Sequence, residues 1–183
     1  MIEKILETLE KVKDFEKKGP NIEVPSEKMQ DIKLNYDSVY KEENNSEIQT
    51  RNGQLEGKNH PETGVAFERK EVETSEGTKE GVFPQFESVC DVNLPEDLEQ
   101  ATDREQFKHC NEQLKDKVEN DSELKGKFTP EQLEQIEENE TPDGYTWHHS
   151  EETGKMQLVD SETHAKTGHT GGKSIWGGGS ENR

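Results

Sequence analysis

Hydrophobic residues are scarce in this sequence, and their scarcity limits the size of any core. Of 183 residues, 25% are hydrophobic, 6% are aromatic and 36% are charged. This composition lies near the boundary between small folded domains and disordered chains. No apolar run reaches the roughly 20 residues that a bilayer-spanning helix needs, and no signal peptide is visible. We therefore expect one domain with a modest core and no membrane-spanning segment.

Basic residues are also few, with 23 Lys and Arg against 42 Asp and Glu and a net charge of −19. Such an excess disfavours nucleic acid as a default partner, because a phosphate-binding surface needs Lys and Arg. The excess is uneven: residues 81–150 carry 18 acidic and 6 basic side chains, whereas residues 151–183 carry 5 and 4. Lys155, Lys166, Lys173 and Arg183 could thus form a small basic face near the C-terminus.

Only two cysteines are present, Cys90 and Cys110. They could pair, but sequence alone cannot show a disulfide. As metal ligands they lack a nearby CxxC partner, so buried free thiols are the favoured interpretation. The sequence also contains no phosphate-binding P-loop, no nucleophile elbow and no dinucleotide fingerprint.

The residues best suited to chemistry are concentrated in one window, residues 141–177. It holds both tryptophans and four of the six histidines: Trp147, Trp176, His148, His149, His164 and His169. The remainder of the chain is acidic and poor in aromatic residues. Any catalytic or metal-binding site is therefore expected in this window.

The local pattern of the window predicts two strands and a short helix. Residues 145–148 have the β-branched and aromatic character of a strand, and residues 155–159 alternate polar and apolar side chains. A polar turn that ends at Gly154 separates the two strands. Residues 160–166 begin with Asp and Ser, which can cap a helix, and Gly168 can end it.

Histidine chemistry suggests a metal site in this unit. Adjacent residues of a strand point to opposite faces, so His148 and His149 cannot both bind one metal if the strand is regular. One can hold a metal while the other acts as a general base. His164 and His169 can share a metal only if the helix breaks near Gly168. A structural zinc site, or no metal at all, is the alternative.

These residues resemble the HNH/endonuclease VII (His-Me finger) nuclease superfamily. Within it, Trp147-His148-His149 matches the group named for a Trp-His-His signature, and residues 156–159 and 164–172 match its remainder. The resemblance implies an α+β fold with a ββα-metal core at about residues 141–176. Better-known members carry a supporting asparagine on the second strand, where this chain has Lys155.

The same resemblance implies roles for individual residues. His149 would be the general base, and His148, His164 and His169 would hold a divalent metal such as Zn, Mg or Mn. Lys155, Lys166 and Lys173 are candidate substrate-binding residues. The two tryptophans are expected to be packing residues rather than base-stacking platforms.

An upstream segment extends the resemblance. Arg51-Asn52, His60-Pro61 and residues 63–67 resemble a segment that precedes the toxic domain in LXG-type polymorphic toxins of Bacillus. This implies a DNA endonuclease toxin, secreted by a dedicated route, acting in the target-cell cytoplasm and neutralised by an immunity protein. An RNase toxin of the same fold, or a non-catalytic zinc-binding interaction module, is the alternative.

The preceding sequence predicts a helical and small β-hairpin elaboration of this core. We expect a helix over residues 1–19, the end of an upstream linker, and a nuclease domain over residues 20–183. Residues 65–72 and 81–89 predict a hairpin, with residues 83–86 at the sheet edge because proline cannot donate to the ladder. Residues 96–119 predict a helical region. Thr129-Pro130-Glu131-Gln132 forms a capping box for a short helix.

Overall fold

A computed structural model describes residues 46–179 of the chain. Nearly all of them belong to the unit Glu47–Arg183, one of two into which the chain divides. The helix predicted over residues 1–19 and the domain start expected at residue 20 lie outside the described residues. The described part has two small antiparallel sheets and a few helices, which confirms the predicted α+β class.

The first sheet contains the predicted hairpin. Its strands, in the order β1-β2-β3, are β1 (Lys58–Asn59), β2 (Ala66–Thr74) and β3 (Gly77–Gln85). Thr74 pairs with Gly77 across the tight turn. Gly77 adopts a φ of 104°, a backbone conformation that residues with a side chain rarely adopt. Pro84 lies in the edge strand β3, as predicted. A short 3-10 helix, η1 (Gly53–Leu55), precedes this sheet.

The second sheet carries the histidine pair. Its strands, in the order β4-β6-β5, are β4 (Ser88–Asn93), β6 (Lys155–Asp160) and β5 (Tyr145–His149). The strand predicted over residues 81–89 is in fact divided, because β3 ends at Gln85 and β4 pairs with β6 in the other sheet. The alternating burial of β4 agrees with its pairing in the second sheet. Its buried residues Cys90 and Val92 lie opposite the buried residues Leu158 and Met156 of β6.

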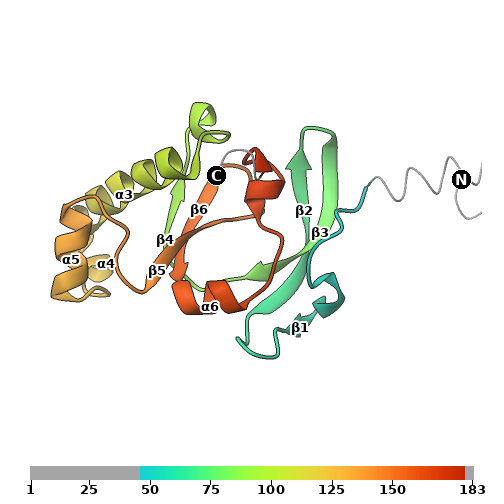
Figure 1. Cartoon of the computed structure of the whole chain (residues 1–183), viewed down its shortest axis with the longest axis horizontal. Helices are drawn as coiled ribbons and strands as arrows, with labels where there is room; N and C mark the ends of the chain where they lie inside the picture. Colours follow the sequence, from blue (N-terminus) through green and yellow to red (C-terminus); the bar gives the residue numbers. More distant parts are fainter. Residues whose placement is uncertain (1–45, 180–183) are drawn as a thin grey trace, which may run out of the picture. The chain divides into compact units, whose positions relative to one another are not determined.

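Helices lie between β4 and β5 in the sequence and on one side of the second sheet, whereas β2 and β3 lie on the other (Figure 1). They are η2 (Glu96–Leu98), α3 (Asp103–Asn120), α4 (Ser122–Lys125) and α5 (Pro130–Glu137). The predicted helical region starts later than expected, since Thr102 and Glu105 form a capping box that begins α3. The capping box predicted for α5 is confirmed.

A single larger core lies between these helices and the second sheet. Its buried residues are Cys90, Val92, Leu94, Cys110, Leu114, Val118, Leu124, Phe128, Ile136, Trp147, Met156, Leu158 and Trp176. Both cysteines are free and buried, as predicted, and burial raises the pKa of the Cys110 thiol to about 12. Trp147 is a packing residue whose indole Nε1 donates to Asn111 Oδ1 over 2.8 Å.

The turn between β5 and β6 is fixed from two directions. Lys70 of β2 lies 2.6 Å from a carboxylate oxygen of Glu151, which is 4% exposed. Trp176 donates its indole N–H to the Ser150 carbonyl over 2.9 Å. Trp176 follows η3 (Gly172–Ser174), and a Cβ at Gly172 would lie 1.9 Å from the Ser150 carbonyl oxygen. Only glycine therefore permits this close approach.

Within residues 46–179, no helix has the length and apolar character needed to cross a membrane.

Candidate active site

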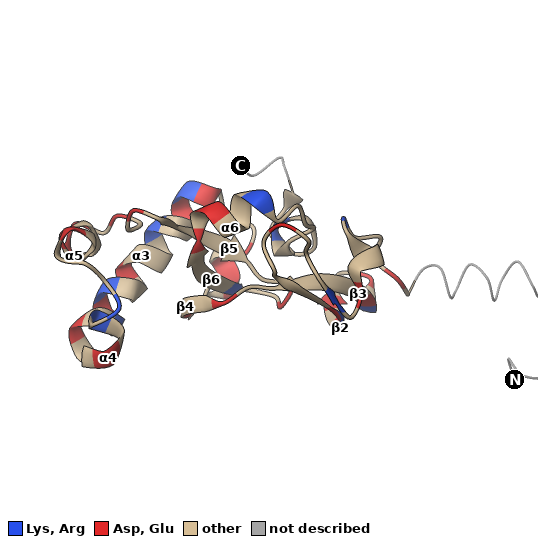
Figure 2. Cartoon of the chain, turned by 90° about the horizontal axis from the view of Figure 1, so that it is seen from below, with Lys and Arg blue, Asp and Glu red and all other residues tan. Residues whose placement is uncertain are grey.

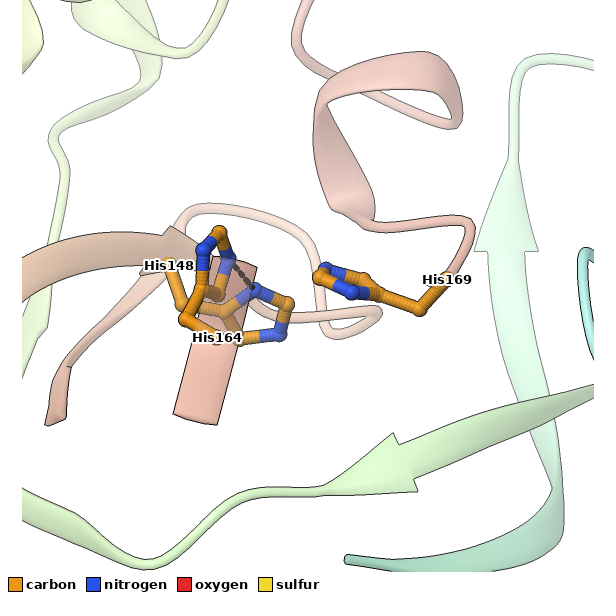
Figure 3. Close-up of side chains that lie close together, drawn as sticks. All are labelled: His148, His164 and His169. Atoms are coloured by element: carbon orange, nitrogen blue, oxygen red, sulfur yellow. Dashed lines mark hydrogen bonds between the residues drawn. The ribbon is translucent and has the colours of Figure 1, made fainter. Parts of the chain in front are cut away.

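Three histidine side chains converge where β5, α6 (Ser161–Lys166) and the loop after α6 meet. They are His148 on β5, His164 on α6 and His169 in the loop. One nitrogen from each ring lies within 4.8 Å of the other two, and His148 Nδ1 is 3.3 Å from His164 Nε2. Figure 3 shows His169 reaching from its loop toward the other pair. The structure thus brings together the three histidines named as candidate ligands.

The end of α6 makes this arrangement possible. Asp160 caps the helix by accepting the Thr163 amide over 2.7 Å. The helix ends at Lys166, and Thr167 leaves the helical conformation with φ −86° and ψ 88°. His169 therefore does not continue around the helix, where a spacing of five residues from His164 would turn it away. The helix ends before Gly168, which is what binding of one metal by both His164 and His169 requires.

Phe86 forms an apolar floor beneath the three imidazoles. The centre of its ring lies 4.8 Å from that of His148, 5.4 Å from that of His164 and 5.1 Å from that of His169. Phe86 follows β3 and is buried. An aromatic ring that contacts all three ligand candidates removes water from one side of the cluster. The sequence pattern placed Phe86 only at a sheet edge and did not connect it with the histidines.

Burial favours the neutral form of the three rings, which is the form that binds a metal. Burial, and then the neighbouring histidines, hold the pKa of His148 well below its usual value. Burial lowers the pKa of His164 to about 4, and burial is also the main cause of the lowered pKa of His169. His169 Nδ1 donates to the Thr167 carbonyl over 2.6 Å, which leaves its Nε2 with the lone pair. Three neutral imidazoles with converging nitrogens fit a divalent metal of the zinc type.

Acid should destabilise the metal-free domain because these rings are buried as neutral groups. The unfolded chain takes up protons below a histidine pKa near 6.5, whereas the folded chain resists them until about pH 4 at His164. The free energy of unfolding should thus fall as the pH drops from about 6.5 to 4, by up to roughly 1.4 kcal/mol per unit of pKa difference for each buried ring.

Urea unfolding of the metal-free chain at pH 7.5 and pH 5 measures this loss. The matched variant His164→Gln keeps a polar side chain that does not titrate. It should lose less stability over the same range than the unaltered chain. An equal loss in both proteins would contradict the assignment of the effect to the buried ring.

His149 occupies a different environment on the opposite face of β5. Its Nε2 lies 2.7 Å from Gln106 Oε1 on α3, and its ring packs against Trp176 and Phe107, with ring centres 5.5 Å and 5.8 Å away. The Gln106 amide is oriented by the carbonyls of Leu98 and Glu99, which accept from its Nε2 over 2.9 Å and 2.7 Å. Its Oε1 must therefore accept from His149.

This hydrogen bond sets the tautomer of His149. Because Gln106 Oε1 can only accept, His149 carries a proton on Nε2, and in the neutral ring the lone pair is on Nδ1. Lys173 approaches the same oxygen over 3.2 Å and lies 2.8 Å from Asp103 Oδ1, which itself is 3.8 Å from His149 Nε2. The His149 ring is thus held by a buried polar cluster, separate from the other three histidines.

Residues 75–171 match the family model described as the DNase/tRNase domain of colicin-like bacteriocin. The matched stretch is more than half of the 183-residue chain and includes all four histidines. The chain belongs to this Colicin-DNase family. It is accordingly a nuclease toxin domain. Comparisons with curated proteins and with solved structures find no match to it.

In this Colicin-DNase domain, the three lysines proposed to bind substrate all lie beside carboxylates. Lys155 is 3.2 Å from Glu152, and Lys166 is 2.6 Å from Glu162. Lys173 is buried and belongs to the cluster around His149. Figure 2 shows basic positions interspersed among acidic ones on α3 and α6. An exposed basic face built from these three side chains is not visible in the structure.

Sequence reasoning did not connect two residues of this Colicin-DNase domain with the histidines. Gln106 is fully buried and lies on the same helical stripe of α3 as the buried residues Cys110 and Leu114. A polar residue at a buried helical position indicates a specific polar partner, and the sequence alone could have shown this signal. Arg51, which the sequence placed in the upstream segment and offered as a candidate lining residue of a substrate groove, is exposed and helps to lower the pKa of His169. Within residues 46–179 it makes no ion pair with a carboxylate.

Proposed function

We propose that this chain is a metal-dependent endonuclease toxin that hydrolyses phosphodiester bonds of DNA, with residues 141–176 as a ββα-metal core. One observation carries the proposal. The neighbours His148 and His149 point to opposite sides of β5, one into a cluster of three neutral imidazoles and the other into a separate polar cluster. A metal-dependent hydrolase uses two different histidines for these two roles, because a ligand nitrogen cannot accept a proton at the same time.

The donor set supports a bound metal. His148, His164 and His169 would hold it, and three protein ligands are the usual number at a catalytic zinc site. When bound, a divalent cation would act as a Lewis acid and stabilise the negative charge on the phosphate and on the leaving 3′ oxygen. Three nitrogen ligands suit zinc best, whereas Mg and Mn prefer ligand sets that are richer in oxygen.

His149 would supply the general base. In its neutral tautomer Nδ1 carries the lone pair, so this nitrogen would accept the proton of the attacking water. The water oxygen would then form a bond to phosphorus, and the bond from phosphorus to the 3′ oxygen would break. Gln106 would keep the ring in this tautomer, a role that other members of the superfamily give to the asparagine absent at Lys155.

Arg51 would bind the phosphate. Its guanidinium packs against the backbone at Gly168, where an added Cβ would lie 2.6 Å from it, and it lowers the pKa of the neighbouring His169. Arginine recognises phosphate through two parallel hydrogen bonds. Unlike the three candidate lysines, it combines exposure, an electrostatic effect on His169 and freedom from a carboxylate among residues 46–179.

Arg51→Ala should therefore raise KM for the nucleic acid substrate and lower kcat/KM, by roughly 10- to 100-fold, the cost of about 1.5–3 kcal/mol for a hydrogen bond to a charged group. Arg51→Lys should restore part of the loss, since it keeps the charge without the fork. Arg104→Ala, which removes an exposed arginine from α3, is the matched control. Equal kinetics for Arg51→Ala and Arg104→Ala would exclude the assignment.

The biological setting follows from the family together with the resemblance to LXG-type toxins. The toxin would be secreted by its producer through a dedicated route and act in the cytoplasm of a target cell. A cognate immunity protein would protect the producer. Because the domain itself carries a net charge of −19, an inhibitor that mimics the acidity of DNA suits it less well than a partner with basic groups.

DNA and RNA are distinct substrates to test, since the family description includes both DNase and tRNase. Purified chain would be incubated with plasmid DNA, total RNA and tRNA, after removal of metal and then with Zn²⁺, Mg²⁺ or Mn²⁺ restored. We expect metal-dependent cutting of DNA. Cutting of RNA alone would keep the site and overturn the substrate. No cutting by folded, metal-loaded protein would favour the non-catalytic zinc-binding module.

A further inference from the structure

The third imidazole, His169, differs from the other two in how it is held. His148 lies in a paired strand, opposite Gln157 of β6. His164 lies on a capped helix that follows the same hairpin. His169, in contrast, lies in an irregular loop, residues 167–170, where no regular hydrogen-bond ladder fixes the backbone. Its position must therefore depend on contacts with other parts of the chain.

Those contacts come from residues more than 100 positions earlier. Asn52 Nδ2 donates to the Gly168 carbonyl over 2.5 Å. The Arg51 amide donates to Thr170 Oγ1 over 2.9 Å. Thr63 Oγ1 lies 2.6 Å from the hydroxyl of Thr167, which is 1% exposed. Each contact falls on the loop that carries His169, and each reaches it from the segment 51–63.

The threonine contact leads directly to the imidazole. The Thr167 hydroxyl bonds to Thr63, and the Thr167 carbonyl accepts Nδ1–H of His169 over 2.6 Å. Thr63 is itself held by His60, whose Nδ1 lies 3.1 Å from the Thr63 hydroxyl and 3.3 Å from its amide. Thr63 thus helps to position Thr167, whose carbonyl in turn fixes the orientation and tautomer of the His169 ring.

The close fit of the segment is also visible in the backbone. Asn52 adopts φ 67°, a left-handed conformation that asparagine tolerates better than most residues. This conformation turns its side chain to the Gly168 carbonyl. A Cβ at Gly168 would lie 2.6 Å from the Arg51 guanidinium, so a larger residue there would displace the Arg51 side chain from its place beside the loop.

We propose that residues 51–63 form a clasp that positions His169 as the third metal ligand, with Asn52 and Thr63 as its positioning residues. The proposal rests on the metal site of the proposed function. It concerns a segment that lies before the residues matched to the family, 75–171. Outer hydrogen-bond partners of metal ligands typically contribute 10- to 100-fold to metal affinity. The clasp should contribute within this range.

The test removes the two side-chain contacts and leaves the backbone conformation possible. Asn52→Gly tolerates φ 67°, and Thr63→Val keeps the shape of the side chain without its hydroxyl. The matched control is Asn139→Gly with Thr78→Val. Asn139 also has a positive φ, 58°, and Thr78 bonds to Glu73 on the hairpin, so both lie outside the clasp.

Zinc affinity, measured by competition with a chelator, and the visible absorption spectrum of bound Co²⁺ are the two readouts. The double variant in the clasp should bind zinc 10- to 100-fold more weakly and show an altered Co²⁺ spectrum, while the control double variant matches the unaltered chain. Thr63→Ser, which restores the hydroxyl, should recover most of the affinity lost at that position. Circular dichroism establishes that each variant is folded.

A double-mutant cycle with His169→Ala separates the clasp from a general loss of stability. If the clasp acts through His169, His169→Ala should cost less affinity in the clasp variant than in the unaltered chain. Unchanged zinc affinity in the clasp variant, or additive losses in the cycle, would overturn the clasp and leave the metal site intact. Absence of zinc binding by the unaltered chain would instead overturn the metal site and the clasp together.

Discussion

Replacement of His149 by alanine is expected to lower the rate constant for phosphodiester cleavage by about 10²- to 10⁴-fold, the usual contribution of a general base. Metal affinity should stay near that of the unaltered chain, because His149 points away from the other three histidines and into the cluster of Gln106 and Lys173. The fold should also persist. Gln106 Oε1 would still accept from Lys173, so the truncation leaves no buried acceptor without a donor.

The measurement combines single-turnover cleavage with a zinc titration on the same protein sample. His109→Ala is the matched control, since His109 lies on α3 outside the cluster of three imidazoles. His149→Gln retains an N–H donor for Gln106 and should be folded, metal-loaded and as slow as His149→Ala. Cleavage by either His149 variant at the rate of the unaltered chain would remove His149 from the mechanism.

Replacement of His148 by alanine should have the opposite signature, with loss of the metal itself. His148 is 2% exposed and contacts both other imidazoles as well as Phe86. Zinc affinity should fall by more than the roughly 100-fold that marks the upper limit for outer hydrogen-bond partners. Metal-dependent cleavage should fall with it. Added zinc should also no longer raise the unfolding temperature, because stabilisation by a ligand depends on its affinity for the folded state.

This pair of variants also separates catalysis from a purely structural zinc site. If the metal serves catalysis, His148→Ala loses metal and His149→Ala keeps it, and both are inactive. If the four histidines only hold the fold, at least three of the four single substitutions should unfold the domain, and no variant should cut nucleic acid. Zinc binding by His148→Ala at unaltered affinity would exclude His148 as a ligand.

Local patterns predicted the strand–turn–strand–helix unit well. Residues 145–148 and 155–159 have strong strand patterns, and Asp160 offers a helix cap, so short-range chemistry alone specifies β5, β6 and α6. The same holds for the capping box at Thr129 and for the hairpin turn before Gly77. In each case the signal that predicted the element, a strand alternation, a turn or a helix cap, involves residues only a few positions apart.

Long-range contacts could not be predicted in the same way. Phe86 lies between β3 of the first sheet and β4 of the second, and it contacts the imidazoles because the chain passes from one sheet to the other at this point. Gln106 meets His149 only because α3 packs beside β5, which no local periodicity indicates. The lysines illustrate the converse. Their charge suggested a basic face, but folding places Lys155 and Lys166 beside carboxylates and buries Lys173.

The hydrogen bonds from Arg51, Asn52 and Thr63 to the loop of His169 span 119, 116 and 104 positions of the sequence. Contacts of such high sequence separation form slowly, because large loops must close before any of them is made. The hairpin and helix that carry His148, His149 and His164 need no such closure. During refolding, secondary structure should thus return before high-affinity zinc binding does, and the delay would separate the folding of the chain from its acquisition of activity.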